Sequence, residues 1–430
     1  MNTFAIATLG CKVNAYESES YIQGLQALNF CEVDFKDAAD VYIINTCAVT
    51  NTAASKSRQK INQAKRNNPH AIICVVGCFV QTSKTLEEFD VDIMIGSSKK
   101  AQLPNLIKNV VQGKKVNVVE DIQQLNSFEL LNVNQFQHKT RAFLKIQDGC
   151  NQYCSYCIIP YARGKERSQP LSKVVESAKQ LVDHGHSEIV LTGIHTGRYG
   201  HDLGIELVDL LKALVTIKQL KRIRISSIEV SELTDELIAF IKNNNKIARH
   251  LHIPIQSGSD CILKAMHRPY TLAQFEEKVQ QIRTQIPNIS ISSDIIMGFP
   301  GEDEQMYNET LDTIKRIHFS FLHVFPFSKR DGTKAEKLSG HLSNQIKKER
   351  CSKVSFLSKK HYNEYIQTFL NQEVEVLFEY EEEGYFYGHT SEYILVKVKS
   401  NQDITNQLWK VKVESVHTKN MLQGSLGGSV

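Results

Sequence analysis

Apolar residues between positions 1 and 110 gather in short runs that are separated by stretches of helical periodicity. Buried strands are predicted at residues 4–9, 41–45, 72–77 and 91–95. Apolar positions with helical spacing predict helices at 14–28 and 51–66. Strands that alternate with helices predict a parallel sheet with helices on its faces.

The same alternation begins again at residue 141 and predicts a second α/β unit. Its strands are predicted at residues 142–147, 188–191, 222–226, 250–254, 289–296 and 319–325. Six strand–helix units predict a parallel barrel or its open three-quarter form, with chemistry at the carboxyl ends of the strands. A small all-β barrel is predicted after residue 369, from short strands at 373–378, 385–389, 394–398 and 408–413.

We therefore expect an α/β protein with an open parallel α/β domain at 1–112, a partial (β/α)6 barrel at 136–368 and a small all-β barrel at 369–430. A chain of 430 residues has room for about three domains of ~150 residues. With 41% hydrophobic and 23% charged residues, the disordered, collagen-like and coiled-coil classes are excluded. The apolar runs are far shorter than the ~20 residues that span a bilayer, so we expect no membrane helix.

Basic residues are concentrated in two stretches, although the net charge is only +4. Residues 51–68 contain no acid, and residues 329–360 contain ten basic and three acidic residues. Such faces are usually solvated helix surfaces, but two of them in one chain are also compatible with binding of a phosphate-rich partner. The side chains predicted to contact that partner are Lys56, Arg58, Lys60, Lys347 and Lys348. The segment 371–430 is net acidic, which weakens the case for such a partner there.

The ten cysteines are the most informative residues of the chain. No basic residue precedes Cys11, so we expect a cytoplasmic protein with free thiols rather than an exported one with disulfides. Cys11, Cys47 and Cys78 each follow a predicted strand. Because open α/β sheets bind ligands at the carboxyl ends of their strands, these three thiols are expected to meet at one edge.

A second group of thiols follows the first strand of the predicted barrel. Cys150, Cys154 and Cys157 have the spacing CxxxCxxC. A structural zinc site needs four ligands, whereas a [4Fe–4S] cluster held by three cysteines leaves one iron free for a substrate. The alternative is a zinc loop that borrows a distant ligand such as His195.

Over its whole length the chain resembles the radical S-adenosylmethionine (SAM) methylthiotransferases. The motifs that carry the resemblance are GCKVNAYESE at 10–19, NTCAVT at 45–50, GC at 77–78, CSYCIIPYARGKERS at 154–168, LTGIHTGRYG at 191–200, HIPIQSGSD at 252–260 and DIIMGFPGE at 294–302. The segment GYFYGHTSEYILVKV at 384–398 is similar to the TRAM module, a small β-barrel of that family.

The resemblance implies two [4Fe–4S] clusters and two molecules of SAM, one supplying the methyl group and one the radical. Cys150, Cys154 and Cys157 would hold the SAM-binding cluster, and Cys11, Cys47 and Cys78 an auxiliary cluster that carries the sulfur. The implied SAM contacts are Gln256, Ser257, Ser227, Glu229 and Gly298. Arg163 and Arg167, just after the cysteine loop, are expected to contact phosphate or SAM unless they belong to a solvated turn. No catalytic side chain is assigned.

Within the family, the motif with Lys12, Asn14 and Glu17 is most similar to the branch that acts on N6-threonylcarbamoyladenosine beside the tRNA anticodon. That implies methylthiolation of C2 of the adenosine at position 37, with flavodoxin or ferredoxin as electron donor. The alternatives are isopentenyladenosine in tRNA, or an aspartate of a ribosomal protein, as the substrate. A remote alternative is a non-catalytic, metal-holding RNA-binding protein. The oligomeric state is not predicted.

Overall fold

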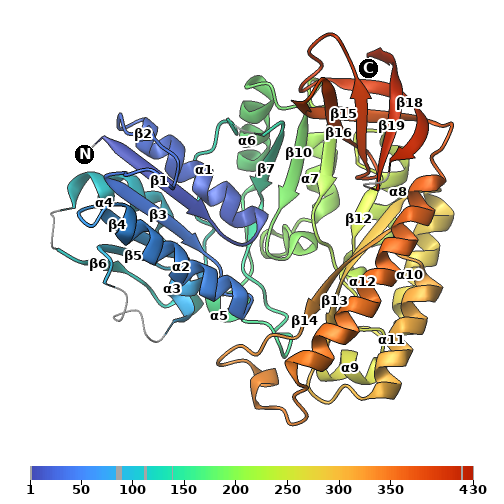
Figure 1. Cartoon of the computed structure of the whole chain (residues 1–430), viewed down its shortest axis with the longest axis horizontal. Coiled ribbons are helices and arrows are strands. Elements are labelled where there is room, and N and C mark those ends of the chain that lie inside the picture. Colours follow the sequence, from blue (N-terminus) through green and yellow to red (C-terminus); the bar gives the residue numbers. More distant parts are fainter. Residues whose placement is uncertain (1, 84–89, 111–113, 138, 418–419, 430) are drawn as a thin grey trace.

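The computed structural model describes residues 2–83, 90–110, 114–137, 139–417 and 420–429 (Figure 1). A parallel sheet, an open parallel barrel and a closed barrel follow one another along the chain (Figure 1). This architecture confirms the predicted α/β class with a small all-β barrel. Of the predicted domain boundaries, residue 112 lies outside the described residues, and those at 136 and 369 stay predictions.

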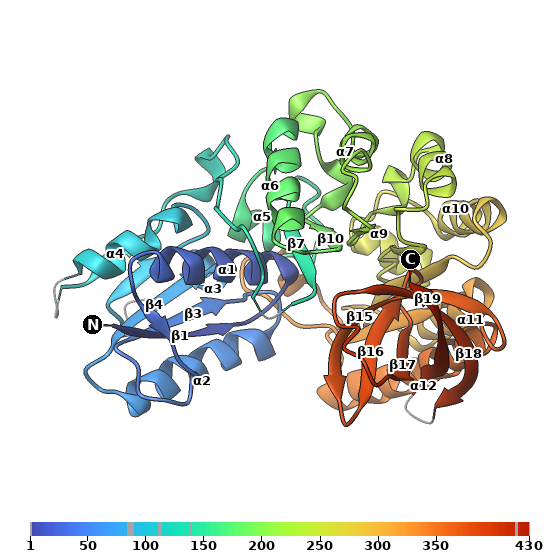
Figure 2. The same ribbon diagram turned by 90° about the horizontal axis from the view of Figure 1, so that it is seen from above.

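The first sheet is parallel, with the strand order β2-β1-β3-β4-β5-β6. Its strands are β1 (Thr3–Thr8), β2 (Cys31–Glu32), β3 (Val41–Thr46), β4 (Ile72–Gly77), β5 (Ile93–Ile95) and β6 (Val116–Val118). Helices cover both faces (Figure 2), α1 (Lys12–Gln26) and α4 (Leu103–Asn109) on one and α2 (Asn51–Asn67) on the other. The strand order reverses between β1 and β3, which is where open α/β sheets bind their ligands.

The second part is a row of parallel strands that bends into an open barrel. The strands pair in two groups, β7 (Arg141–Lys145), β10 (Glu188–Thr192) and β11 (Arg222–Ile225), and β12 (His250–His252), β13 (Ser290–Met297) and β14 (Phe321–Pro326). A parallel bridge between Ser227 and His252 joins the groups. In the described part of the chain β7 and β14 do not pair with each other, so the barrel is open, as predicted.

Helices surround this barrel on the outside (Figure 1). They are α6 (Leu171–Asp183), α7 (Leu207–Leu214), α8 (Asp235–Asn243), α10 (Leu272–Gln285) and α11 (Glu304–Ile317), and the shorter helices of the molecule are α3 (Cys78–Thr82), α5 (Ile159–Arg163) and α9 (Asp260–Ala265). The basic helix α12 (Asn344–Gln367) runs along β14, where Leu322 N donates to Ser358 Oγ at 3.0 Å. None of the described helices is long and apolar enough to cross a membrane.

The last strands close into a barrel in the order β15-β16-β17-β19-β18. They are β15 (Glu373–Glu382), β16 (Tyr385–Thr390), β17 (Leu395–Lys399), β18 (Leu408–His417) and β19 (Met421–Ser429). The strand β19 is absent from the sequence prediction, because its glycines weaken a strand pattern. Gly424 is required there, since a Cβ would lie 2.1 Å from the carbonyl oxygen of Lys412.

Buried arginines of the open barrel hold the closed barrel in place. Arg222 Nη1 donates to the carbonyl oxygen of His389 at 3.1 Å, and Arg224 Nη2 donates to that of Thr390 at 3.1 Å. Both arginines pair with the buried Glu188 of β10, at 3.2 and 2.8 Å. The closed barrel therefore lies against β10 and β11 near their first residues, Glu188 and Arg222.

Candidate functional site

The thiols of Cys11, Cys47 and Cys78, called here the N-terminal triple, meet at the carboxyl edge of the first sheet. The strand ends are level at that edge, where Thr46 of β3 pairs with Gly77 of β4. The backbone of Gly10 lies so close that a Cβ on it would be 3.0 Å from Cys47 Sγ. The predicted convergence of the three strand-end cysteines is therefore present in the structure.

The surroundings of the N-terminal triple fit a metal cluster held by thiolates. Burial raises the pKa of Cys11 and raises the pKa of Cys47 to about 11, while the charge of Arg163 opposes both shifts. Arg163 Nε also donates to Cys78 Sγ at 3.2 Å. Metal binding displaces thiol protons, and a neighbouring guanidinium stabilises the thiolates that result.

Arg163 belongs to a buried charge cluster that ties the first sheet to the open barrel. Its Nη1 donates to Glu17 Oε1 at 2.9 Å and to Asp148 Oδ1 of the short strand β8 (Gln147–Asp148) at 3.2 Å. The ammonium groups of Lys100 and Lys145 lie 2.6 and 3.3 Å from Glu17 Oε1. Burial by itself would raise the pKa of Glu17, but these three cations outweigh it and hold that pKa well below its usual range.

The expectation that Arg163 and Arg167 contact RNA needs correction. Arg163 is fully enclosed, and Arg167 of the short strand β9 (Arg167–Ser168) is only 3% exposed. Arg167 donates to the carbonyl oxygens of Lys165 and Arg163, both at 2.8 Å. Side chains held in this way cannot reach an RNA backbone. A basic residue after a cysteine loop has the same sequence signal whether it becomes a buried counter-ion or a surface contact.

The second group, Cys150, Cys154 and Cys157, lies on one loop after β8 and is called here the loop triple. Burial raises the pKa of Cys154 and raises that of Cys157 to about 12. Arg268 Nη1 donates to Cys154 Sγ at 3.4 Å, and Arg268 also pairs with Glu229. The loop triple, like the N-terminal triple, therefore includes thiols whose pKa is raised and one arginine that contacts a sulfur.

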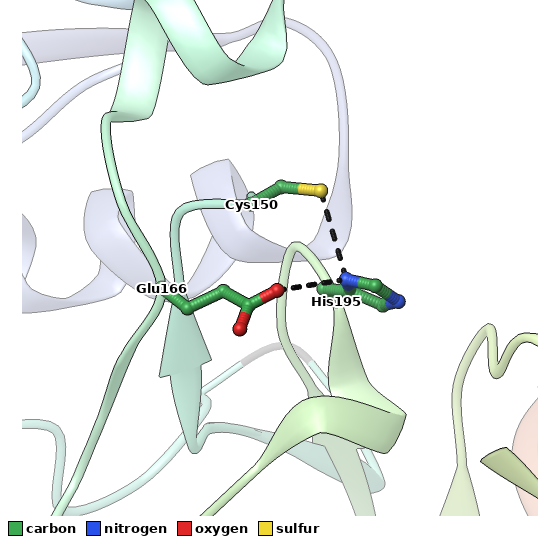
Figure 3. Close-up of side chains that lie close together, drawn as sticks. All are labelled: Cys150, Glu166 and His195. Carbon is green, nitrogen blue, oxygen red and sulfur yellow. Dashed lines mark hydrogen bonds and ion pairs between the residues drawn. The ribbon is translucent and has the colours of Figure 1, made fainter. Parts of the chain in front are cut away.

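His195, the possible zinc ligand, lies beside the loop triple (Figure 3). Its Nδ1 is 3.6 Å from Cys150 Sγ and 3.4 Å from Glu166 Oε1, and its Nε2 is 2.6 Å from Glu232 Oε1. Burial alone would lower the pKa of His195, but Cys150, Glu166 and Glu232 raise it to about 12. The ligand atoms of Cys150, Glu166 and His195 also lie within 4.8 Å of one another, so the zinc alternative stays a prediction.

The residues expected to contact SAM lie at the carboxyl ends of consecutive barrel strands. Ser227 follows β11, Gln256 and Ser257 follow β12, and Gly298 follows β13. Gln256 has a positive φ of 67°, and its N–H donates to the carbonyl oxygen of Asp294 at 2.9 Å. Glu229 pairs with Arg268, the arginine that contacts Cys154. The strand-end positions agree with a SAM site, and the individual contacts stay predictions.

A cavity of about 690 Å³ fills the interior of the open barrel. Alternate residues of the strands point into it, such as Ser292 and Asp294 of β13, and the closed barrel contributes Tyr393 to its wall. Cys11 of the N-terminal triple lines the same cavity, as does Gly193, two residues before His195. Its size is that of a small-molecule site. Cys11 therefore places the N-terminal triple at the cavity, whereas Cys150, Cys154 and Cys157 are not among its lining residues.

The predicted phosphate contacts differ in exposure. Lys56, Arg58 and Lys348 are exposed, whereas Lys60 and Lys347 are half-buried. Lys60 Nζ donates to Gln63 Oε1 at 2.9 Å, and Lys347 Nζ donates to the carbonyl oxygen of Phe327 at 3.3 Å.

The two basic stretches meet at the amino terminus of α2. Arg330 Nη1 donates to Asn51 Oδ1 at 2.6 Å, and Asn51 N donates to Ser328 Oγ at 3.1 Å. Segments far apart in the sequence thus become neighbours on one side of the molecule.

The comparisons with known proteins first define a class. Residues 144–314 match the radical SAM superfamily, and residues 3–96 match the uncharacterized protein family UPF0004. Among solved structures, the chain resembles the radical SAM methyltransferase TsrM from Kitasatospora setae, with a TM-score of 0.56 and 15% identity over 78% of this chain and 77% of that one. At that identity the likeness concerns the fold alone. SAM and a [4Fe–4S] cluster are the cofactors of this superfamily.

The curated relatives narrow the class to a family. The chain is 44% identical to threonylcarbamoyladenosine tRNA methylthiotransferase MtaB of Bacillus subtilis (strain 168), over 96% of this chain and 94% of that protein. It is 34% identical to tRNA-2-methylthio-N(6)-dimethylallyladenosine synthase of Moorella thermoacetica, over 97% and 96%. The chain therefore belongs to the radical SAM methylthiotransferases, as its motifs predict.

Several residues of the site escaped the sequence reasoning, among them Arg268, Glu232 and Lys145. Arg268 follows α9 and carries no motif, yet it contacts Cys154 of a loop more than a hundred residues earlier. Glu232 and Lys145 meet His195 and Glu17 only through the packing of separate elements of the fold. None of these contacts has a spacing that one sequence displays.

Proposed function

We propose that the protein transfers a methylthio group to C2 of N6-threonylcarbamoyladenosine at position 37 of tRNA. The observation that carries the proposal is the cavity of the open barrel, whose wall contains Cys11 together with strand-end residues such as Gly193 and Ser227. The MtaB relatives from Bacillus subtilis and Aquifex aeolicus, at 44% and 40% identity, support the choice of nucleoside. The protein would act in the cytoplasm, where thiols stay reduced.

A [4Fe–4S] cluster with bound SAM supplies one-electron cleavage of SAM, which makes an unactivated C–H bond reactive. In our proposal the loop triple holds that cluster. The N-terminal triple holds a second cluster that carries the sulfur, and a flavodoxin or ferredoxin supplies the electron. Two SAM molecules are used, one for the methyl group and one for the radical.

The side chains of this protein prepare the site in three ways. Arg163 and Arg268 each donate a hydrogen bond from a positively charged guanidinium to a cysteine sulfur, which favours the thiolate over the thiol. His195 holds a positive charge beside Cys150 through its contacts with Glu166 and Glu232. The barrel walls surround the cavity and limit the access of water, which protects radical chemistry from side reactions.

The basic surface where α2 meets the loop after β14 would bind the tRNA backbone. Lys56, Arg58 and Lys348 are exposed and therefore remain proposed phosphate contacts. Single-stranded anticodon nucleosides are targets that proteins read by splaying bases out and stacking them. An anticodon base could thus enter the cavity while the phosphates stay on the surface.

The test is nucleoside analysis of tRNA treated with reconstituted enzyme, SAM and reductant. We expect 2-methylthio-N6-threonylcarbamoyladenosine with the natural protein and none with Cys150→Ala. Methylthiolation of isopentenyladenosine instead, or of a ribosomal protein, would overturn the substrate assignment and leave the chemistry intact. No methylthiolated product from any of these substrates would overturn the chemistry as well.

A further inference from the structure

The cavity contains a lysine whose charge is not neutralised by the protein. Lys12, the first residue of α1, lines the cavity directly after Cys11. Within the ranges that the structure describes, Lys12 makes neither an ion pair nor a hydrogen bond through its side chain. Lys12 is exposed at the cavity wall, so its ammonium group is accessible to an anionic ligand that enters the cavity.

None of the other charged groups of the cavity wall lies within ion-pair distance of Lys12 in the described part of the chain. Arg224 Nε donates to Glu188 Oε1 at 2.8 Å, and its Nη1 donates to the carbonyl oxygen of Ser391 at 3.0 Å. Asp294 lies 3.2 Å from His252 Nε2. Glu392, on the closed barrel, is not within ion-pair distance of Lys12. The cation left for a ligand is therefore Lys12.

The rest of the wall suits a flat aromatic ligand. Aromatic side chains line the cavity from β14, α12 and the closed barrel, namely Phe321, Phe325, Tyr362, Tyr365 and Tyr393. Aromatic faces stack on nucleobases, and the ammonium group of Lys12 can form a charge-assisted hydrogen bond with an anion. The ligand that fits this wall is a nucleobase whose substituent contains one negatively charged group.

We propose that Lys12 binds the carboxylate of the threonylcarbamoyl group and so selects that nucleoside. This inference rests on the proposed function. The threonyl carboxylate is ionised at neutral pH, whereas a dimethylallyl substituent is apolar and would leave Lys12 unpaired. On the adenine ring, C2 and the N6-bearing C6 flank N1. A base with C2 toward the N-terminal triple therefore turns its substituent toward the same wall, in which Lys12 follows Cys11.

The test pairs a change in the protein with a matching change in the ligand. Anticodon stem-loops with adenosine, N6-threonylcarbamoyladenosine or its neutral carboxamide at position 37 are titrated into cluster-loaded enzyme without reductant, and binding is followed by fluorescence anisotropy. We expect the natural enzyme to prefer the acid over the carboxamide by about 10- to 100-fold, the value of a charge-assisted hydrogen bond. Lys12→Met should bind both equally, and Lys12→Arg should keep the preference.

The control is Lys218→Met, which removes an exposed lysine far from the cavity wall and should change nothing. An acid preference that survives in Lys12→Met overturns the proposal. Equal weakening of all three stem-loops also overturns it, because Lys12 then contacts phosphate. Loss of SAM affinity with the acid preference intact would assign Lys12 to the carboxylate of SAM and likewise overturn it.

Two further measurements separate a loss of ligand binding from a loss of the cluster. Iron content is measured for each variant, since Lys12 neighbours Cys11. If Lys12→Met loses iron, Lys12→Gln replaces it, and a natural enzyme that does not distinguish acid from carboxamide overturns the proposal by itself. Failure of the proposed function would give a different result: the natural enzyme would neither convert the threonylcarbamoyl stem-loop nor bind it more tightly than the adenosine stem-loop.

Discussion

The two cysteine triples are built alike around their sulfur atoms but are assembled in different ways. Beside each triple a buried arginine donates to one sulfur and pairs with one glutamate: Arg163 with Cys78 and Glu17, and Arg268 with Cys154 and Glu229. The loop triple lies within residues 150–157 of one loop, whereas the N-terminal triple comes from separate strand ends between residues 11 and 78.

The charges around the two glutamates differ as well. Glu17 faces the three cations Arg163, Lys100 and Lys145, and its pKa is lowered despite its burial. For Glu229 burial is the larger influence, and its pKa is raised although Arg268 opposes that shift. The N-terminal triple thus depends on charges that two packed domains supply together, whereas the charges beside the loop triple, such as Arg268 and Glu229, come from the open barrel alone.

The largest expected effect comes from removing either triple. Natural protein prepared without oxygen should contain about eight irons, and each triple changed to alanine should leave about four. Product formation should fall below detection in both variants, because each cluster performs a separate part of the reaction. Iron and sulfide analysis with nucleoside analysis checks this. Cys31→Ala, outside both triples, should behave like the natural protein. Zinc in place of iron, or an iron content that is the same in the variants as in the natural protein, would contradict the assignment of one cluster to each triple.

Next in size is the loss of a buried counter-ion. Glu17→Gln removes the negative charge that three enclosed cations share, and breaking a buried ion network typically costs about 3–5 kcal/mol of folding free energy. Glu229→Gln should cost less, because it leaves one cation unpaired. Urea unfolding of both variants measures the difference. The control is Glu176→Gln, whose exposed pair with Lys173 should matter by under about 1 kcal/mol. Equal losses for Glu17 and Glu229 would remove the distinction between the triples.

A smaller effect is expected on the reduction potentials of the two clusters. Lysine in place of Arg163 or Arg268 keeps the charge but loses the planar guanidinium that donates to sulfur. Because a hydrogen bond to sulfur stabilises the more negative reduced cluster, its loss should lower the potential by on the order of 40 mV. Each variant is measured by redox titration in protein that holds only one cluster. A shift in both clusters from either variant would contradict the local role of each arginine.

The smallest effect is a difference in pH dependence with opposite signs. Glu17 has a lowered pKa, so its contribution to stability is present above the usual value of 4.5 and is lost as the pH falls below it. Glu229 has a raised pKa, so its ionisation costs stability, and the protein gains as the pH falls through that raised value. The gap in melting temperature between natural protein and Glu17→Gln should narrow on acidification from pH 7. The melting temperature of natural protein should instead rise relative to that of Glu229→Gln. Gaps that move in the same direction would refute this assignment.

Much of the fold follows from the periodicity of the sequence. The predicted strands at 41–45 and 72–77 become β3 and β4, because buried parallel strands appear as continuous apolar runs. The strand β19 escapes prediction, because Gly424 serves a close backbone approach and not a side-chain pattern. The predicted meeting of Cys11, Cys47 and Cys78 succeeds, since strand ends of one parallel sheet share an edge.

By itself, the sequence determined the order of elements, the cysteine spacing and the family to which the chain belongs, because these properties are local or linear. Tertiary structure decided which charges become partners. Arg163 looks like a surface contact in the sequence and becomes the counter-ion of Glu17, because the open barrel docks on α1. Lys12 is one basic residue among many in the sequence, and only the fold places it at the cavity wall with no acid of the described structure within ion-pair distance. Charge pairing depends on distances of a few ångströms between distant segments, and only packing sets those distances.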